Sequence, residues 1–449
     1  MDFPQEYFTF VKEHLADDPA SLRLRFHGDS REWIAPAIGN IAALKKGGKF
    51  KIGDKDFTPR VIPVELSAQQ ATSARVANLH ATLAAEMFWK DPLPLHILDM
   101  TLGLGMDARM LLTKFSDATL KAFDLNPLLV DAARVNFVEE GTSVNFTEES
   151  PRVDIECADS VEYLRNLPES ERFDLIFIDP ARRGDSGQRL FNLHDCQPDL
   201  IDLLPLLRRH TSFVMAKLSP MLDVTQTLRD LPCTRELHIV EESGECKEIL
   251  ALIDFTPSTP LSDIKIIIDR FSGNRYQDFA FTQAEEAAAA EDMRSASHYL
   301  GRLPRRGEIL LEPSAAAMKA APFALLASRF GIAPLHPNTH LYVATDTTTA
   351  LSDFPGTQYM VEAAWPFSSS VLKRLPALAS EAYFPENPGR QVKVDIAVRN
   401  LKGFTPEILR RKTRLKPGDD MRLYGATLAT PSGDKPALIL TRRLEAKPN

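Results

Sequence analysis

The stretch "HILDMTLGLGMDA" runs from His96 to Ala108. Its first part is an apolar run that ends in a carboxylate, Asp99, which is typical of a buried strand with a polar group at its carboxyl end. Gly103 and Gly105 follow, and glycines let the backbone turn tightly and approach a ligand closely. The stretch therefore predicts a strand, a tight turn and a helix N-terminus, whose backbone N–H groups are donors for a ligand.

Further strand-like segments follow this one, and helical sequence separates the first of them. After one strand, Asn126 is placed to cap a helix whose first residue is Pro127. Strands alternating with helices predict a mainly parallel sheet with both faces covered. The later strands have little helix between them, which predicts an antiparallel addition at one edge. The predicted strands cover residues 96–100, 119–124, 152–157, 173–179, 212–217, 236–242, 248–255 and 264–270.

The composition is that of an ordinary soluble globular chain. Of 449 residues, 44% are apolar and 25% are charged, which is close to the average for such proteins. No run of 18 apolar residues indicates a membrane span, and the first residues lack the layout of a signal peptide. The four cysteines form no C-x-x-C pair, which favours a reduced, cytoplasmic protein.

Breaks in the pattern predict four parts. Residues 1–90 read as a helical region, and residues 91–285 hold the predicted sheet. A small α+β segment follows at 286–350, and a last module at 351–449. Within the first part, the Ala-rich segment Leu66–Lys90 predicts one helix with Ser67 as its N-cap.

Three carboxylates end three successive predicted strands. They are Asp99, Asp124 and Asp159. In an open parallel sheet, ligands bind outside the carboxyl ends of the strands. Asp124 is placed to accept both hydroxyls of a ribose, and Asp159 lies where an adenine amino group would be bound. Together with the glycine loop, which also fits G-x-G-x-x-A, they predict an adenosine-type cofactor.

The charges near the loop favour one such cofactor over another. Asp99 precedes the glycines and Asp107 follows them. Carboxylates there would repel the pyrophosphate of NAD, but they would attract the sulfonium and amino groups of S-adenosylmethionine (SAM). SAM is therefore the predicted cofactor, and an NAD-dependent oxidoreductase is the weaker alternative.

The fourth strand ends in "IFIDPARRGDSG" (176–187). Asp179 and Pro180 are the candidate catalytic residues, because a carboxylate or carbonyl beside a methyl donor can accept an N–H and orient the attacking nitrogen. Arg182 and Arg183 are candidates for holding a substrate phosphate. Lys217, after the fifth strand, is a further candidate substrate contact.

These motifs resemble those of class I SAM-dependent methyltransferases, over residues 95–255. Asp99, Gly103 and Gly105 match the first motif of that family, and Asp124, Asp159 and Asp179-Pro180 match its later ones. The resemblance implies a Rossmann-like sheet and SAM binding that also involves Thr101, Leu125 and Ser160. Asp107 departs from the usual third glycine, and D-P-A-R departs from D-P-P-Y. No cysteine follows the fifth strand in "AKLSPMLD" (216–223), which makes covalent C5 chemistry doubtful.

The rest of the chain resembles a bacterial subfamily of these enzymes, through "LEPSAAAMKA" (311–320), "HPNTHLY" (336–342) and "AVRN" (397–400). The resemblance implies a ferredoxin-like segment and a C-terminal THUMP-like domain, and hence an RNA substrate such as tRNA or rRNA. Residues 371–449 carry sixteen Lys+Arg and eight Asp+Glu, although the whole chain has a net charge of −8. The candidate RNA contacts are Arg399, Arg410, Arg411, Lys412 and Arg414.

Two other functions stay open on the sequence: methylation of a protein or small molecule, and non-catalytic binding of SAM or RNA. No metal site is predicted. Glu242, Glu245 and Glu248 flank Cys246, but no histidine lies at ligand spacing, so this segment is interpreted as a surface hairpin.

Overall fold

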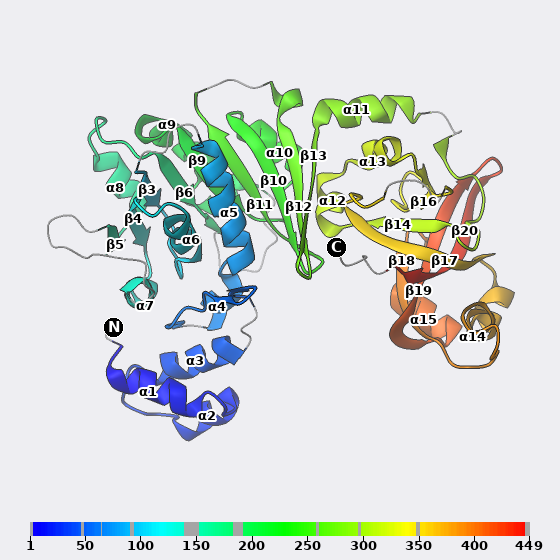
Figure 1. Cartoon of the computed structure of the whole chain (residues 1–449), viewed down its shortest axis with the longest axis horizontal. Coiled ribbons are helices and arrows are strands. Elements are labelled where there is room, and N and C mark those ends of the chain that lie inside the picture. Colours follow the sequence, from blue (N-terminus) through cyan, green and yellow to red (C-terminus); the bar gives the residue numbers. More distant parts are fainter. Residues whose placement is uncertain are drawn as a thin grey trace. The chain divides into compact units, whose positions relative to one another are not determined.

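The computed structural model of the chain describes residues 3–45, 49–63, 65–89, 94–138, 152–182, 192–256, 260–294, 298–346 and 351–444. The chain divides into two compact units (Figure 1). The first comprises residues 1–235 and 250–258, and the second comprises residues 236–249 and 259–449. The predicted part 91–285 has residues in both units, so the four predicted parts do not follow this division and remain a prediction.

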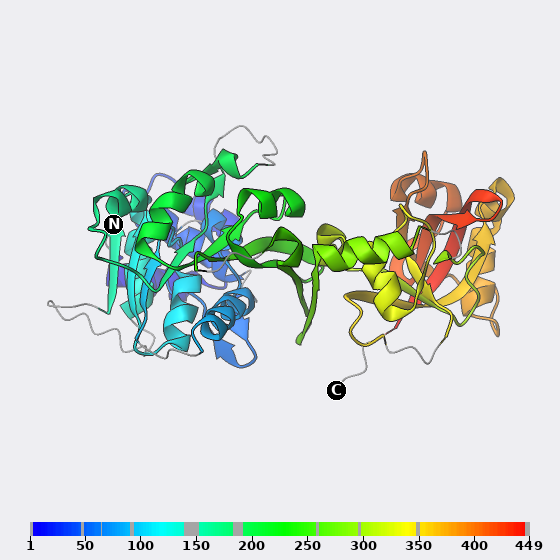
Figure 2. The same ribbon diagram turned by 90° about the horizontal axis from the view of Figure 1, so that it is seen from above.

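The first unit is an α/β layer structure that follows a small N-terminal helical bundle. Helices lie on both faces of its parallel strands (Figure 2), as predicted from the alternation of strands and helices. Its elements are α1 (Gln5–His14), α2 (Pro19–Arg25), α3 (Ile34–Lys45), β1 (Lys51–Ile52), β2 (Lys55–Asp56), α4 (Glu65–Gln70), α5 (Ala74–Met87), β3 (His96–Asp99), α6 (Met106–Lys114), β4 (Thr119–Asp124), α7 (Pro127–Val138), β5 (Val153–Cys157), α8 (Ser160–Asn166), β6 (Leu175–Ile178), β7 (Ala181–Arg182), β8 (Cys196–Gln197), α9 (Leu200–His210), β9 (Phe213–Leu218) and α10 (Val224–Asp230).

Nine strands form the main sheet, in the order β13-β12-β10-β11-β9-β6-β3-β4-β5. The added strands are β10 (Thr234–Glu242), β11 (Glu245–Asp254), β12 (Lys265–Ser272) and β13 (Arg275–Thr282). All eight strands predicted from the sequence are present, with ends shifted by at most three residues. The predicted antiparallel addition is confirmed, because β12 and β13 pair antiparallel. A two-residue turn of Ser243 and Gly244, both with positive φ, joins β10 to β11 as a hairpin.

The strand register brings the predicted site residues to one edge. Asp99 of β3 is paired with Phe177 of β6, and Ile178 of β6 is paired with Ala216 of β9. Asp179 and Lys217 each follow directly on the last of these pairs. Because parallel strands end at the same edge of the sheet, the carboxylates at the ends of β3, β4 and β6 lie around a common opening.

Local sequence explains how the loops at this edge are held. The side chain of Asn126 accepts a hydrogen bond from the Leu128 N–H at 3.0 Å, which confirms the predicted cap of α7. Gly105 is the N-cap of α6 at φ +75°, a left-handed conformation that favours glycine. A Cβ on Gly105 would lie 2.6 Å from the Phe137 ring of α7, so this position also has no room for a side chain.

The single helix predicted over Leu66–Lys90 is wrong. Two helices, α4 and α5, are separated by residues 71–73. Ser73 rather than Ser67 caps the longer helix, because its side chain accepts a hydrogen bond from the Val76 N–H. The backbone N–H of Ala74 bonds to the Lys49 carbonyl, which fixes the break. The Ala-rich composition favours helix throughout, and this tertiary contact overrides it.

The second unit is built on a seven-stranded sheet in the order β15-β16-β14-β17-β20-β19-β18. Helices α14 and α15 contact each other beside this sheet (Figure 1). The remaining elements are α11 (Gln283–Asp292), β14 (Ile309–Pro313), α12 (Ala315–Ala320), α13 (Phe323–Phe330), β15 (Ala333–Pro334), β16 (Tyr342–Ala344), β17 (Gly356–Pro366), α14 (Ser369–Tyr383), β18 (Lys393–Arg399), α15 (Pro406–Thr413), β19 (Lys416–Thr430) and β20 (Gly433–Arg443).

A buried carboxylate organises the middle of this second sheet. Glu312 of β14 is 8% exposed. It pairs with Arg399 of β18 at 2.8 Å and with Arg422 of β19 at 3.4 Å, and it accepts a hydrogen bond from Tyr424. A buried charge needs such partners, so Glu312 ties β14 to the strands at the other end of the sheet.

Among the residues that the structure describes, none of the helices has the length and apolar character that a membrane span requires.

The packing of Gly105 against Phe137 predicts the effect of Gly105→Ala. We expect this variant to lower the free energy of unfolding by about 1–3 kcal/mol, because it strains φ and displaces the ring. Chemical denaturation measures the loss. Gly53→Ala is the matched control, since Gly53 has φ +56° but open space around it. Equal losses in the two variants would show that the contact with Phe137 is unimportant.

Candidate active site

A cavity of about 620 Å³ opens at the carboxyl edge of the parallel strands. Its wall combines the glycine loop after β3 with the ends of β4, β6 and β9 and with the start of α8. Residues 67 and 70–72, from α4 and the break that follows it, complete the wall. The cavity therefore includes a contribution from the N-terminal region that the sequence did not indicate.

The predicted cofactor residues lie together at this cavity and hold one another in place. The Thr101 N–H donates to Asp99 at 3.0 Å. The Gly103 N–H donates to Asp124 at 2.9 Å, and the second oxygen of Asp124 accepts from the Asn126 N–H. Each carboxylate oxygen has a further lone pair, so Asp124 can still accept the hydroxyls of a ribose.

Asp159, Ser160 and Leu125 also line the cavity. The Asp159 carboxylate caps α8 by accepting from the N–H groups of Val161 and Glu162. The structure thus gives Asp159 a local role as a helix cap and places it on the cavity wall. Its contact with adenine stays a prediction. Leu125 is 66% exposed, so its apolar side chain offers contact area to a flat ring.

Asp99 is 1% exposed. Burial raises the pKa of its carboxyl group to about 8. The nearby carboxylates of Asp107, Asp124 and Asp179 also raise this pKa, whereas the hydrogen bond from Thr101 lowers it. Asp99 therefore holds a proton at neutral pH in the protein without ligand. A cationic ligand placed beside these four carboxylates would relieve their mutual repulsion.

The predicted catalytic residue Asp179 lies in the same cavity, and Pro180, which follows it, is buried. The Asp179 N–H donates to the Thr101 hydroxyl at 2.6 Å, so one threonine links the glycine loop to the end of β6. Lys217 donates to the Asp179 carboxylate. The side chains of Lys217 and Asp179 are 14% and 39% exposed, so this ion pair is partly shielded from water.

Two residues at the site, Thr72 and His80, were not predicted from the sequence, and both contact Asp107. Thr72 donates to one oxygen of Asp107 at 2.6 Å, and His80 Nδ1 lies 2.7 Å from the other. Burial acts to raise the pKa of Asp107, but its bond to His80 and the charge of Lys217 lower the pKa below its usual value. Asp107 was predicted to exclude phosphate. Its position at a strand-to-helix turn gave no signal of the partners that bury it.

Of the two arginines predicted to hold a substrate phosphate, only Arg182 lies within the residues that the structure describes. Arg182 ends the short strand β7, paired with Cys196 of β8, and Arg183 lies outside the described residues. Lys217, predicted as a substrate contact, lines the cavity and is bound to Asp179.

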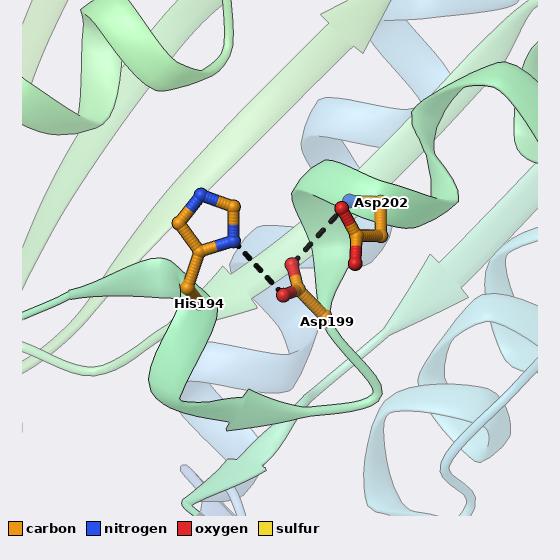
Figure 3. Close-up of side chains that lie close together, drawn as sticks. All are labelled: His194, Asp199 and Asp202. Atoms are coloured by element: carbon orange, nitrogen blue, oxygen red, sulfur yellow. Dashed lines mark hydrogen bonds and ion pairs between the residues drawn. The ribbon is translucent and has the colours of Figure 1, made fainter.

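A cluster of His194, Asp199 and Asp202 lies on α9 and the turn before it (Figure 3). Asp199 accepts from the Ile201 and Asp202 N–H groups, which makes it the N-cap of α9, and it contacts His194 Nδ1 at 2.9 Å. The bond to Asp199 raises the pKa of His194. The hydrogen bonds within the cluster are those of a helix cap and of the contact between His194 and Asp199. Asp199 and Asp202 also add negative charge to the cavity wall.

The candidate RNA contacts fall into two groups. Arg399 pairs with Glu312, and Arg410 donates to the Val394 carbonyl at 3.1 Å, so both hold the second unit together. Arg411, Lys412 and Arg414 are exposed on or just after α15. The segment around Cys246 forms the predicted hairpin, in which Glu248 is buried.

Comparisons with known proteins agree with this architecture. A family model described as a ferredoxin-like domain matches residues 310–355, which confirms such a domain in the chain. Its bounds differ from the predicted 286–350. No curated protein sequence matches the chain.

The chain is similar over its full length to the crystal structure of a "putative methyltransferase" from Porphyromonas gingivalis W83. The two are 28% identical, with 99% of this chain and 100% of that chain covered and a TM-score of 0.75. Human methyltransferase-like protein 13, solved with S-adenosylhomocysteine (SAH), is 18% identical, with 42% of this chain and 84% of that chain covered and a TM-score of 0.31. A methyltransferase from Geobacter sulfurreducens is 15% identical, with 41% and 78% covered and a TM-score of 0.28. The last two likenesses are too partial to carry an argument.

The fold is the Rossmann-like α/β fold of class I SAM-dependent methyltransferases. The similarity to the Porphyromonas gingivalis structure also covers the ferredoxin-like domain and the C-terminal strands.

The raised pKa of Asp99 predicts the behaviour of Asp99→Asn. Because the folded state holds a proton on Asp99 that the unfolded state releases near pH 4, the stability of the wild-type protein decreases as the pH rises from about 4 to about 8. Asparagine removes this effect and can keep the bond from Thr101. We expect thermal unfolding to show a stabilisation of the variant that grows over this range, to about 5 kcal/mol for a pKa raised from 3.8 to about 8. A constant difference between pH 4 and 8 would contradict it.

Proposed function

We propose that this chain transfers a methyl group from SAM to RNA. The observation that carries the proposal is one cavity that has Asp124, Asp159 and Asp179 on its wall. Asp99 is buried next to this wall and accepts a hydrogen bond from Thr101, which lines the cavity. Asp99, Asp124 and Asp159 provide carboxyl groups suited to a cationic amino acid group and a nucleoside. Asp179 provides an acceptor for the proton of the atom to be methylated.

In this proposal different residues of the chain bind the nucleoside of SAM, compensate its positive charge and orient the attacking group. SAM, when bound, supplies an electrophilic methyl group on a sulfonium. The backbone N–H groups after β3 and the carboxylate of Asp124 hold the nucleoside, and the carboxylates near Asp99 balance the positive charge. Asp179 accepts a hydrogen bond from the attacking group and directs its lone pair toward the methyl carbon. Such positioning supplies much of the rate in a reaction of this kind.

The RNA substrate is inferred from the second unit. Exposed basic residues lie on α14, on α15 and on the segments beside them: Lys373, Arg374, Arg390, Lys402, Arg411, Lys412, Arg414 and Lys416. A basic surface of this kind suits the phosphates of an RNA backbone. The resemblance of this module to THUMP-like domains supports tRNA or rRNA as the substrate.

Methyl transfer is tested with total bacterial RNA and SAM that carries a deuterated methyl group, followed by mass spectrometry of the nucleosides. We expect a labelled nucleoside with the wild-type protein and none with Asp179→Asn, which should still bind SAM and SAH. Asp124→Ala should weaken binding of both ligands by about tenfold or more, through the loss of a carboxylate acceptor.

Asp117→Ala is the control for these variants, because Asp117 is an exposed carboxylate of the same unit outside the cavity wall. Labelled protein in a lysate treated with ribonuclease, with no labelled nucleoside, would overturn the RNA substrate and retain the methyltransferase. Failure of the wild-type protein to bind SAM or SAH by calorimetry would overturn the whole proposal.

The exposed residues of α15 give a separate prediction. The double variant Arg411→Gln/Lys412→Gln should bind RNA more weakly at every sequence, and the slope of log K against log salt should become shallower by about 1–2, since fewer ions are released. Fluorescence anisotropy with labelled tRNA at several salt concentrations measures both. Lys435→Gln, an exposed position on β20, is the control. A double variant with an unchanged slope would reject this surface.

A further inference from the structure

A chain of polar contacts leads from the candidate catalytic carboxylate into the N-terminal helices. Lys217 donates to Asp179 and also to the hydroxyl of Thr72 at 3.2 Å. The Thr72 hydroxyl donates to Asp107 at 2.6 Å, and Asp107 contacts His80 at 2.7 Å. All these groups belong to the first unit of the chain.

The direction of these hydrogen bonds is fixed by chemistry. A lysine ammonium only donates, and a carboxylate only accepts. A threonine hydroxyl has one proton, which Thr72 donates in its hydrogen bond to Asp107. The Thr72 oxygen therefore accepts the hydrogen bond from Lys217. The ammonium is therefore held between an acceptor on the break after α4 and the carboxylate that follows β6.

Burial makes this arrangement rigid. Thr72 is 7% exposed, Asp107 is 8% exposed and His80 is fully buried. The break between α4 and α5 is fixed on its α4 side by the bond from the Ala71 N–H to the Ser67 carbonyl. On its α5 side it is fixed by the Ser73 cap and by the bond from the Ala74 N–H to the Lys49 carbonyl. A side chain anchored in this way cannot follow Lys217 if the lysine moves, so Lys217 has one favoured position.

We propose that Thr72 is a positioning residue, which holds the ammonium of Lys217 against the carboxylate of Asp179 and so fixes that carboxylate for methyl transfer. The inference rests on the proposed function, because it gives Asp179 the role stated there. It adds a residue from the N-terminal helical region to the site, and it gives Lys217 a role in orienting Asp179.

The positioning is tested first without any RNA, by NMR of the protein labelled with ¹⁵N-lysine. An ammonium held by two acceptors and shielded from water should give a slowly exchanging Nζ signal, which is assigned by its absence in Lys217→Arg. We expect Thr72→Val to shift or broaden this signal and Thr72→Ser to preserve it. The same signal in wild type and Thr72→Val would overturn the proposal, whatever the substrate is.

The catalytic consequence is tested with the RNA assay at saturating SAM. Thr72→Val should lower the rate of methyl transfer by about tenfold with little change in SAM affinity, and Thr72→Ser should restore most of the rate. Lys217→Met should be slower still, and the acid limb of its pH–rate profile should move to higher pH, since the carboxylate loses its cation. Thr82→Val on α5 is the control, because the Thr82 hydroxyl donates within its own helix, to the Asn78 carbonyl.

The two proposals fail in different ways. If the wild-type protein binds SAM but transfers no methyl group to RNA, the proposed substrate is wrong, and the lysine signal still decides whether Thr72 positions Lys217. If the wild-type protein methylates RNA and Thr72→Val does so at the same rate and with the same pH profile, the role of Thr72 is wrong and the proposed function stands.

Discussion

The candidate site depends on the electrostatic repulsion between carboxylates that the fold brings to one edge of the sheet. Parallel strands end at one edge, and in this chain β3 and β4 end in an aspartate, Asp179 follows the last residue of β6, and α6 adds Asp107. Four carboxylates near one cavity cannot all be ionised in a buried setting without cations. Two features of the structure reduce this repulsion. Asp99 keeps a proton, and Lys217 lies against Asp179 while His80 lies against Asp107.

This balance gives a physical reason for the kind of ligand the cavity suits. A dinucleotide would add phosphates to a wall that already carries excess negative charge, whereas a sulfonium with an amino group would replace the proton on Asp99 as the compensating charge. The two ends of the cavity also differ in how the negative charge is compensated. Near Asp179 the compensating charge is the ammonium of Lys217, and near Asp99 it is a proton on the carboxyl group itself.

The sequence was sufficient to predict the sheet and the residues that end its strands. Asp99, Asp124 and Asp179 were identifiable because apolar runs of strand length stop at each of them, and a parallel sheet brings such ends together. Thr72 and His80 were not identifiable, because they lie in an Ala-rich segment whose local propensity favours a continuous helix. The break at residues 71–73 depends on a contact with Lys49, about twenty-five residues away, which no local pattern encodes. In the C-terminal module, the count of basic residues did not distinguish Arg399 and Arg410, which are bound internally, from Arg411 and Lys412.

The break between α4 and α5 has a consequence for how such chains can exchange segments during evolution or in a library of chimaeras. A crossover placed between residues 90 and 95 looks harmless, since it falls just before the first strand of the sheet. It would nevertheless join Thr72 and His80 of one parent to Asp107 and Lys217 of another, and so separate polar partners that must be inherited together. Residues 65–87 and 95–218 therefore form one unit of recombination, although the sequence between them reads as a linker.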